Sequence, residues 1–315
     1  MWLRLAVVFV VVAVAGAQAQ DLISARAGFV NYRHGQVNLP KDPDGKPIRQ
    51  LQQGQSVSTR FGRAELLLVP GSFLRLDNES EARLISSSLE DARVELLSGT
   101  ATLEVNEIPK GASLTLLWRG FLIPVTKPGL YRFEPGPDSM RIYVEEGKLK
   151  LPGSKETIKA GKYVDLTAAG TLSAAMKFNR KNQDEFDRWS ASRSLQLARA
   201  SFVAASSLRR WPFSLRSSLW YWDPFGFYTF LPYSSTIYSP FGFPYYCPRT
   251  IYISHPRSHS PGGMRGGGVG SGRNVGGSAP GPGATAAPAP PTVSSPRGMN
   301  ADRPPPGGIK SRIPD

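Results

Sequence analysis

Residues 64–105 repeat one short pattern, in which an apolar strand, a turn and another strand follow one another. Three turn sequences interrupt this stretch: Pro70-Gly71, 77–80 (DNES) and Ser98-Gly99. Between the turns apolar and polar residues alternate, as where Leu74 and Leu76 flank Arg75. A two-residue period predicts strands with one buried face and one solvated face, which is typical of antiparallel sheets in a sandwich or barrel.

The same pattern continues beyond Val105. Further strands are predicted at 114–118, 121–125, 130–133, 141–145, 148–151 and 163–166. Turn signals separate them at intervals of about 8–12 residues, which favours an all-β sandwich or barrel over an α/β fold. We therefore expect an all-β domain over residues 21–175, which is long enough to bury roughly two thirds of its unfolded surface.

The N-terminus has the three parts of a secretory signal peptide over residues 1–19. Arg4 supplies a positive charge, residues 5–16 are apolar, and Ala17 and Ala19 are the small residues that a signal peptidase reads. The alternative is an uncleaved membrane anchor, but a bilayer core needs ~20 apolar residues. We expect cleavage after Ala19, no transmembrane span in the mature form, and an exported protein in the periplasm or outside the cell.

The net charge of +14 is unevenly distributed. Residues 21–189 contain 24 basic and 21 acidic side chains, whereas residues 190–315 contain 13 basic and 3 acidic ones. A balanced domain with a basic extension suits an anionic envelope surface at least as well as nucleic acid. Export makes nucleic acid a less suitable partner, and no aromatic residues alternate with the arginines of the tail as single-strand binding would require. No nucleic-acid partner is expected.

A helix is predicted within residues 176–210. Asn182 followed by Glu185 forms a capping box, and Asp184 adds a carboxylate to the first turn. Apolar residues then share one stripe at helical spacing: Phe186, Trp189, Leu197, Ala200, Ala204 and Leu208. This stripe is expected to pack on the chain's own domain, with docking to a partner as the alternative.

Residues 211–256 form a connector rich in aromatic residues and proline. Pro-Phe-Gly interrupts it at 224–226 and at 240–242, which excludes a periodic helix. Its aromatic side chains could cover the β domain, stack on sugar rings or self-associate. Six of them are candidate interaction residues: Trp220, Tyr221, Trp222, Phe225, Phe227 and Tyr228. The Gly/Pro/Ser-rich tail, 257–315, is predicted to be disordered because it has little apolar surface to bury.

The sequence contains no recognisable catalytic, metal or cofactor site. Glu145 and Glu146 are adjacent in a predicted strand, so their side chains should point to opposite faces, which argues against a shared acid–base role. His255 and His259 lie in a non-helical stretch with no nearby cysteine or carboxylate. The single cysteine, Cys247, excludes an internal disulfide. We therefore expect a protein that is not an enzyme and has no cofactor.

Several of the strand and turn sequences resemble the FecR-like domain of bacterial envelope proteins. The resemblance is carried by 63–66 (RAEL), 70–76 (PGSFLRL), 94–105, 142–149 (IYVEEGKL) and 158–162 (IKAGK). The segments 186–189 (FDRW) and 220–226 (WYWDPFG) also resemble extensions of export-targeted members. The resemblance implies an all-β periplasmic domain, and the founding members of the family pass an iron-uptake signal from an outer-membrane transporter to a sigma factor.

This chain departs from those regulators in two respects. They carry a cytoplasmic helical segment and a membrane span before the β domain, where this chain has a signal-peptide sequence. The family's Gly-Thr-x-Phe before a late strand is replaced here by 127–133 (KPGLYRF). The resemblance therefore implies a domain reused for binding rather than direct control of a sigma factor.

Two hypotheses follow. In the first, a non-enzymatic exported protein with a FecR-like domain binds a protein or glycan of the cell envelope, in a sensing or adaptor role in signal transduction. In the second, the chain is a structural component of the envelope or matrix, which binds polysaccharide or another anionic polymer through its aromatic and basic C-terminal region. The sequence leaves the identity of the partner and the oligomeric state open.

Overall fold

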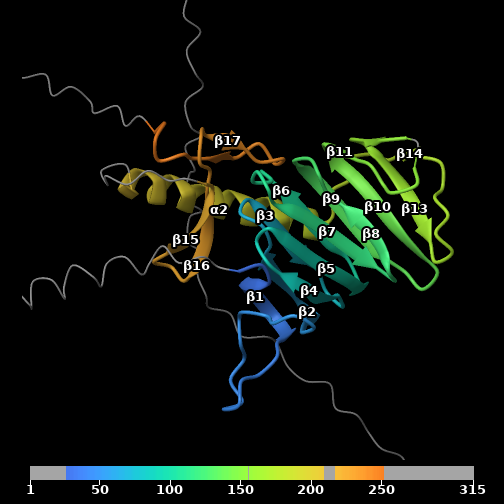
Figure 1. The fold of residues 1–315 in the computed structure, drawn as a ribbon, viewed down its shortest axis with the longest axis horizontal. Helices are drawn as coiled ribbons and strands as arrows, with labels where there is room; N and C mark the ends of the chain where they lie inside the picture. The colour runs from blue at the N-terminus through green and yellow to red at the C-terminus, as the bar shows by residue number, and fades with distance from the viewer. Residues whose placement is uncertain (1–25, 155, 209–216, 252–315) are drawn as a thin grey trace, which may run out of the picture. The chain divides into compact units, whose positions relative to one another are not determined.

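The computed structural model describes residues 26–154, 156–208 and 217–251. The proposed signal peptide with Ala17 and Ala19, the paired histidines 255 and 259, and the tail 257–315 lie outside these residues. The described part is mainly β, with one helix and a 12-stranded sheet, which confirms the predicted all-β fold class. The order of hydrogen-bonded strands is open: β14 lies at one end of the path and β8 at the other (Figure 1).

The sheet folds into two layers that share strand β2. The first layer contains β2 (Ser56–Leu67), β3 (Ser72–Leu76), β6 (Ala101–Val105), β9 (Gly129–Pro135), β10 (Ser139–Glu146), β13 (Lys162–Thr167) and β14 (Met176–Lys177), in that order. The second layer continues from the start of β2 through β4 (Glu81–Ser87), β5 (Asp91–Ser98), β7 (Ser113–Trp118) and β8 (Phe121–Pro124). The long strand β2 can serve both layers because its first residues pair with β4 and its last ones with β3.

Most neighbouring strands are antiparallel, as the alternation predicted. The exception is β5, which pairs in parallel with β7. Strand β1 (Phe29–Asn38) pairs with β2 along most of its length, and the sequence interpretation did not foresee it. A small antiparallel pair, β11 (Lys148–Leu149) with β12 (Ile158–Lys159), lies beside the main sheet.

One hydrophobic core lies between the two layers. Its members come from both layers and include Leu74 and Leu103 of the first and Val94 and Leu116 of the second. These residues belong to the alternating set that the sequence singled out, and their period of two places them on the inward face. The alternating pattern therefore identified the core side of these strands correctly.

The opposite face of β3 and β6 was predicted to be solvated, and this prediction is wrong. Every residue of both strands is buried, including Arg75, Thr102 and Glu104. The outer face is covered here by helix α2 (Glu185–Leu208) and by the connector that follows it. Alternation in the sequence indicates that the two faces of a strand differ in polarity. It does not indicate whether a later segment of the chain will cover the polar face.

Helix α2 lies within the segment predicted to be helical. Its capping box differs from the predicted one, because Asp184 Oδ1 accepts from the Asp187 N–H (2.8 Å) while Asp187 Oδ2 accepts from the Asp184 N–H (3.1 Å). This reciprocal pair satisfies two N–H groups that the first helical turn leaves free. Asn182 is consequently not the capping residue.

The connector forms two hairpins. Strands β15 (Leu219–Asp223) and β16 (Phe227–Leu231) pair across the first Pro-Phe-Gly, and β17 (Ile237–Tyr238) pairs with β18 (Pro244–Tyr245) across the second. The sequence interpretation recognised these tripeptides as breaks but not as hairpin turns. Gly226 and Gly242 both have positive φ, which a side chain would disfavour, so each tripeptide reverses the chain.

Candidate functional site

A buried network of charged side chains lies between α2 and the sheet. The Arg75 guanidinium donates from Nε to Glu65 Oε2 (3.0 Å) and from Nη1 to Glu104 Oε2 (2.7 Å). From α2, Arg193 Nε donates to Glu65 Oε1 (3.2 Å), and Ser194 Oγ donates to Glu104 Oε1 (2.9 Å). The four charged side chains are almost completely buried. The network therefore attaches the helix to the outer face of the sheet.

The electrostatics of Glu65 show that its charge is fully compensated. Burial opposes its ionisation, but attraction to Arg193 and Arg75 outweighs burial and holds the pKa of Glu65 below its usual range. In the same way burial opposes the charge of Arg75, while Glu104 and Glu65 raise its pKa. Charges without such partners are strongly disfavoured in an interior. These residues consequently serve the structure, although the buried Nη2 of Arg75 has no hydrogen-bond partner among the described residues.

The connector is held on the same face by hydrogen bonds that join distant parts of the chain. Asn31 Nδ2 donates to the Tyr228 carbonyl (2.9 Å), and the Tyr228 N–H donates to Asn31 Oδ1 (2.6 Å). Thr229 Oγ1 donates to the Leu197 carbonyl of α2 (2.6 Å). Of the three roles considered for the connector, the described residues 217–251 display the first, which is to cover the β domain.

The six candidate interaction aromatics have different environments. Trp220 is buried, with its ring centroid 5.0 Å from that of Phe73 in β3. Phe225, in the turn between β15 and β16, is 87% exposed. The remaining four are partly buried: Tyr221, Trp222, Phe227 and Tyr228. The structure thus brings these residues together on one hairpin but leaves mainly Phe225 accessible to a partner.

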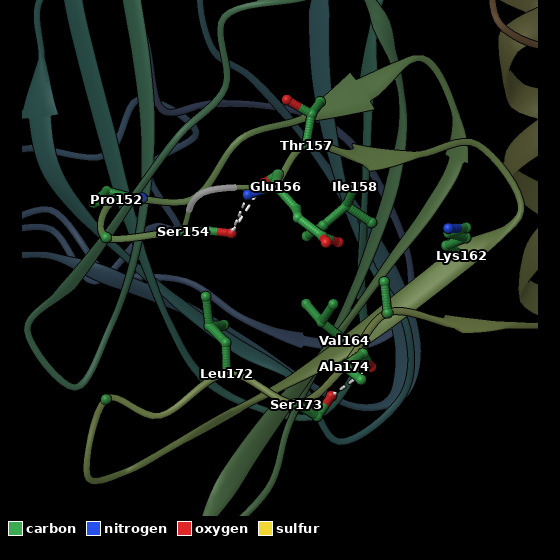
Figure 2. Close-up of a pocket in the computed structure, with 13 residues that line it drawn as sticks. Pro152, Ser154, Glu156, Thr157, Ile158, Lys162, Val164, Leu172, Ser173 and Ala174 are labelled. Carbon is green, nitrogen blue, oxygen red and sulfur yellow. Dashed lines mark hydrogen bonds between the residues drawn. The ribbon is translucent and has the colours of Figure 1, made fainter.

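A groove opens where β8, at one end of the strand path, lies near β13 and the 170–175 segment from the other end. Its larger part, about 560 Å³, lies between the 152–158 segment and the 170–175 segment. Figure 2 shows Ile158, Val164 and Leu172 around this opening. Its smaller part, about 290 Å³, shares Leu172 with the larger one and runs along 120–123. The two parts adjoin beside β8: the smaller part is mainly apolar, whereas the larger part also exposes polar side chains such as Glu156 and Lys162.

Strand β8 presents a free edge to this groove. The turn before it has positive φ at Arg119 (49°) and Gly120 (83°), as a type I′ hairpin turn requires. Trp118 therefore pairs with Phe121 through hydrogen bonds, and the next residue, Leu122, directs its N–H and C=O away from β7. Within the described residues β8 has no second neighbouring strand. The side chain of Leu122 is 51% exposed.

The two adjacent glutamates do not point to opposite faces. The pairing of β10 with β9 has a register irregularity between Val144 and Glu146, so Glu145 is the extra residue of a β-bulge. Glu145 and Glu146 consequently line the same cleft, which also contains Asp187. The premise of the sequence argument about this pair is wrong, because strict alternation fails at a bulge.

The other candidate chemistry is sparse. Among the described residues no three His, Cys, Asp or Glu side chains gather so as to hold a metal ion. Cys247 is buried, and its Sγ donates to the Tyr233 carbonyl (3.2 Å). His34 lies in β1, opposite Arg63 of β2.

Sequence analysis missed the groove, although one signal for it was present. Residues 121–123 are Phe-Leu-Ile and follow a two-residue turn. A short strand with this sequence is apolar on both of its faces. A strand that is apolar on both faces is either covered on both sides or leaves one apolar face exposed. The bulge at Glu145, in contrast, has no signal in the sequence, since only the pairing with β9 creates it.

Comparisons with known proteins give few matches. Among the described residues, no helix has the length and apolar character needed to cross a membrane. No protein-family model matches the chain, and no curated protein matches its sequence. Two crystal structures of a proposed anti-sigma factor from Parabacteroides distasonis ATCC 8503, at 2.50 and 1.65 Å resolution, match with a TM-score of 0.33. They are 15% and 14% identical to this chain, and each match covers 40% of this chain and 61% of the other.

Proposed function

We propose that this chain is a non-enzymatic, exported protein of the FecR-like kind, which binds an extended segment of a cell-envelope protein in a sensing or adaptor role. The observation that carries the proposal is the groove beside the free edge of β8. The resemblance of the strand and turn sequences to the FecR-like domain supports the same class of function. The N-terminal signal sequence supports the envelope as the location.

The geometry of the groove suits a peptide in extended conformation. The free N–H and C=O of Leu122 can pair with the backbone of an added strand, which supplies affinity independently of the peptide's sequence. Apolar side chains at alternate positions of that strand can enter the hollow lined by Ile123, Leu166 and Leu172. Pro124 lacks an N–H, so the added pairing is short and the hollow supplies much of the selectivity.

In-cell photo-crosslinking of the full chain tests this proposal. A photoreactive residue replaces Leu122 in one variant and Phe61 in another; Phe61 is 75% exposed but lies in β2, away from the groove lining. We expect a discrete envelope protein to be captured through position 122 and not through position 61. Equal capture at both positions, or capture of polysaccharide alone, would contradict the proposal.

A blocking substitution adds a matched control. Ala174 lines the groove and is exposed, so Ala174→Trp should fill the groove without disturbing the core. Ala169 is equally exposed in the same turn region but does not line the groove. Capture through position 122 should fall at least about tenfold with Ala174→Trp and stay unchanged with Ala169→Trp. Equal effects of the two substitutions would contradict the assignment of the groove.

A structural role in the envelope is the second candidate. The exposed aromatic side chains of Phe225 (87%) and Tyr238 (70%) on the connector support it, since such residues can stack on sugar rings. Removing the whole of residues 211–315 is not a clean test, because the hairpins cover Phe73 and Leu67. The double variant Phe225→Ala, Tyr238→Ala in the full chain should reduce retention in the envelope if this role holds, and unchanged retention would count against it.

A further inference from the structure

A second cleft, separate from the groove, lies on the outer face of the sheet. Its volume is about 430 Å³. Its lining joins three strands, the start of α2 and the β17–β18 turn: Thr102, Leu130, Glu145, Glu146, Arg180, Lys181, Gln183, Asp187, Pro240 and Phe241. We name it the acidic cleft. None of its lining residues belongs to the groove beside β8.

The guanidinium groups at the acidic cleft are already engaged, whereas the side chains of Lys181 and Gln183, which also line it, are exposed. Arg180 forms an ion pair with Glu146. Arg132, just behind the lining, contacts Asp184 (2.7 Å), Asp187 (3.0 Å) and Glu134 (2.9 Å). Both guanidinium groups are therefore already paired with carboxylates of this chain.

Two acceptors in the cleft are not engaged. The half-buried carboxylate of Glu145 has no hydrogen-bond or ion-pair partner among the described residues. Thr102 is only 3% exposed, and its buried Oγ1 also lacks a partner. Buried polar groups without partners are uncommon in native structures and costly. Burial, and next the nearby Asp187, raise the pKa of Glu145 to about 7.

Among the described residues, no cationic side chain of the acidic cleft donates a hydrogen bond to Glu145 or Thr102. A primary ammonium group has three N–H donors and no acceptor, which matches a carboxylate and a hydroxyl that both await a donor. An aliphatic chain behind the ammonium can lie against Leu130, Pro240 and Phe241. A compact ammonium suits two separate acceptors, a carboxylate and a hydroxyl, better than the planar fork of a guanidinium does. No three His, Cys, Asp or Glu side chains of the described residues are grouped so as to hold a metal ion.

We propose that the acidic cleft binds a primary ammonium group carried on an aliphatic chain, with Glu145 and Thr102 as its acceptors. A small diamine and the lysine side chain of a partner share this chemistry. The site is independent of the groove beside β8, so either assignment can fail without the other.

Calorimetric titration of the full mature chain with cadaverine at pH 8 tests the site. Cadaverine should bind, whereas 1-pentanol, which has a chain of the same length but no ammonium, should not. Glu145→Gln should weaken cadaverine binding roughly 10- to 100-fold, and Thr102→Val about 3- to 10-fold, as expected for loss of a charged and a neutral hydrogen bond. Glu90→Gln, which removes an exposed carboxylate outside the cleft, should leave binding unchanged.

Two further compounds, Nα-acetyl-lysine amide and its Nε-acetyl derivative, are titrated in the same way. They distinguish a lysine side chain of a partner from a small diamine as the source of the ammonium group. Tighter binding of Nα-acetyl-lysine amide than of cadaverine indicates a lysine side chain of a partner, and the reverse order indicates a free diamine. Binding of the Nε-acetyl derivative as tightly as its parent, or of 1-pentanol as tightly as cadaverine, would overturn the proposal. Equal losses of cadaverine affinity in the Glu145→Gln and Glu90→Gln variants would also overturn the proposal.

The dependence on pH provides a second readout. Several charged groups face Glu145: Glu146 from its own strand, Arg132 from β9, Arg180 and Lys181 from the segment before the helix, and Asp184 and Asp187 from its start. Because Glu145 must be ionised to bind the ammonium, the affinity should be about tenfold lower at pH 6 than at pH 8. The Glu145→Gln variant should lose this dependence; a profile that persists in the variant would contradict the role of Glu145.

Discussion

Glu65 and Glu145 lie on the same outer face of the sheet, and their surroundings are opposite. Glu65 accepts hydrogen bonds from Arg75, Arg193 and Asn31, and its pKa lies below the usual range. Glu145 has no such partner among the described residues, and its pKa is raised to about 7. Glu65 is fully buried and Glu145 half-buried, and only Glu65 is hydrogen-bonded by side chains that compensate its charge.

The difference separates a structural role from a binding role. A compensated carboxylate holds elements together, and here it holds α2 to β2 and β3. An uncompensated one makes the folded state less stable and is retained more readily where a ligand supplies the missing partner. The two regions therefore predict opposite effects on stability when the carboxylate is removed.

The largest expected effect is at Glu65. Glu65→Ala leaves Arg75 and Arg193 buried without a partner, and we expect the free energy of unfolding to fall by about 4 kcal/mol. Glu95→Ala, which breaks the more exposed pair with Arg83, should cost less than about 1 kcal/mol. Urea denaturation measures both values, and similar losses for the two variants would contradict the structural role of the buried network.

The contribution of Glu65 to the free energy of unfolding should depend on pH. The pKa of Glu65 is lowered on folding, so its stabilising contribution is complete above its unfolded value of about 4.5. That contribution is lost as the pH falls through the lower, folded pKa. In Glu65→Ala this part of the acid-induced loss of stability should be absent.

The second-largest expected loss of stability is at Trp220, in the connector that covers β3. Trp220→Ala removes a buried ring packed against Phe73 and Phe230, and should cost about 3 kcal/mol. Phe225→Ala, in the same hairpin but largely exposed, should change stability by less than about 0.5 kcal/mol. If both substitutions had equal effects on thermal unfolding, the connector would not be packed as described.

The smallest expected effect has the opposite sign. Glu145→Gln should increase the free energy of unfolding by roughly 2 kcal/mol at pH 8, because it removes a partly desolvated charge. The folded-state pKa is raised, so Glu145 binds a proton more readily in the folded protein between pH 4.5 and about 7. The gain should therefore shrink as the pH falls toward 5. A loss of stability at pH 8 would contradict the view that Glu145 lacks a partner.

Much of the fold could be predicted from local sequence. The turns at 70–71 and 98–99 lie between the observed strands, and the alternating apolar residues of β3, β5 and β6 form the core. These features are local, since a strand's period and a turn's residues depend on their neighbours in sequence. The short strand β12 and the hairpins of the connector gave weaker signals, because they have few residues or interrupted alternation.

The candidate sites could not be predicted in the same way. The groove depends on which strand ends the sheet, and the acidic cleft depends on a bulge in the pairing of β9 with β10. Neither property belongs to a single segment. The six aromatics of the connector were correctly noticed as unusual, but their sequence did not distinguish the buried Trp220 from the exposed Phe225.

The sequence by itself determined most strands of the β domain after residue 64, the turns between them and their inward face, because each arises from contacts between residues that are near in the chain. The tertiary structure alone decided that Arg75 is buried, that Glu145 and Glu146 share a cleft and that the connector covers β3. The bonds responsible join distant residues, such as Asn31 with Tyr228, which are 197 positions apart. No local pattern encodes such a pairing, since it forms only when both segments reach the same face of the sheet.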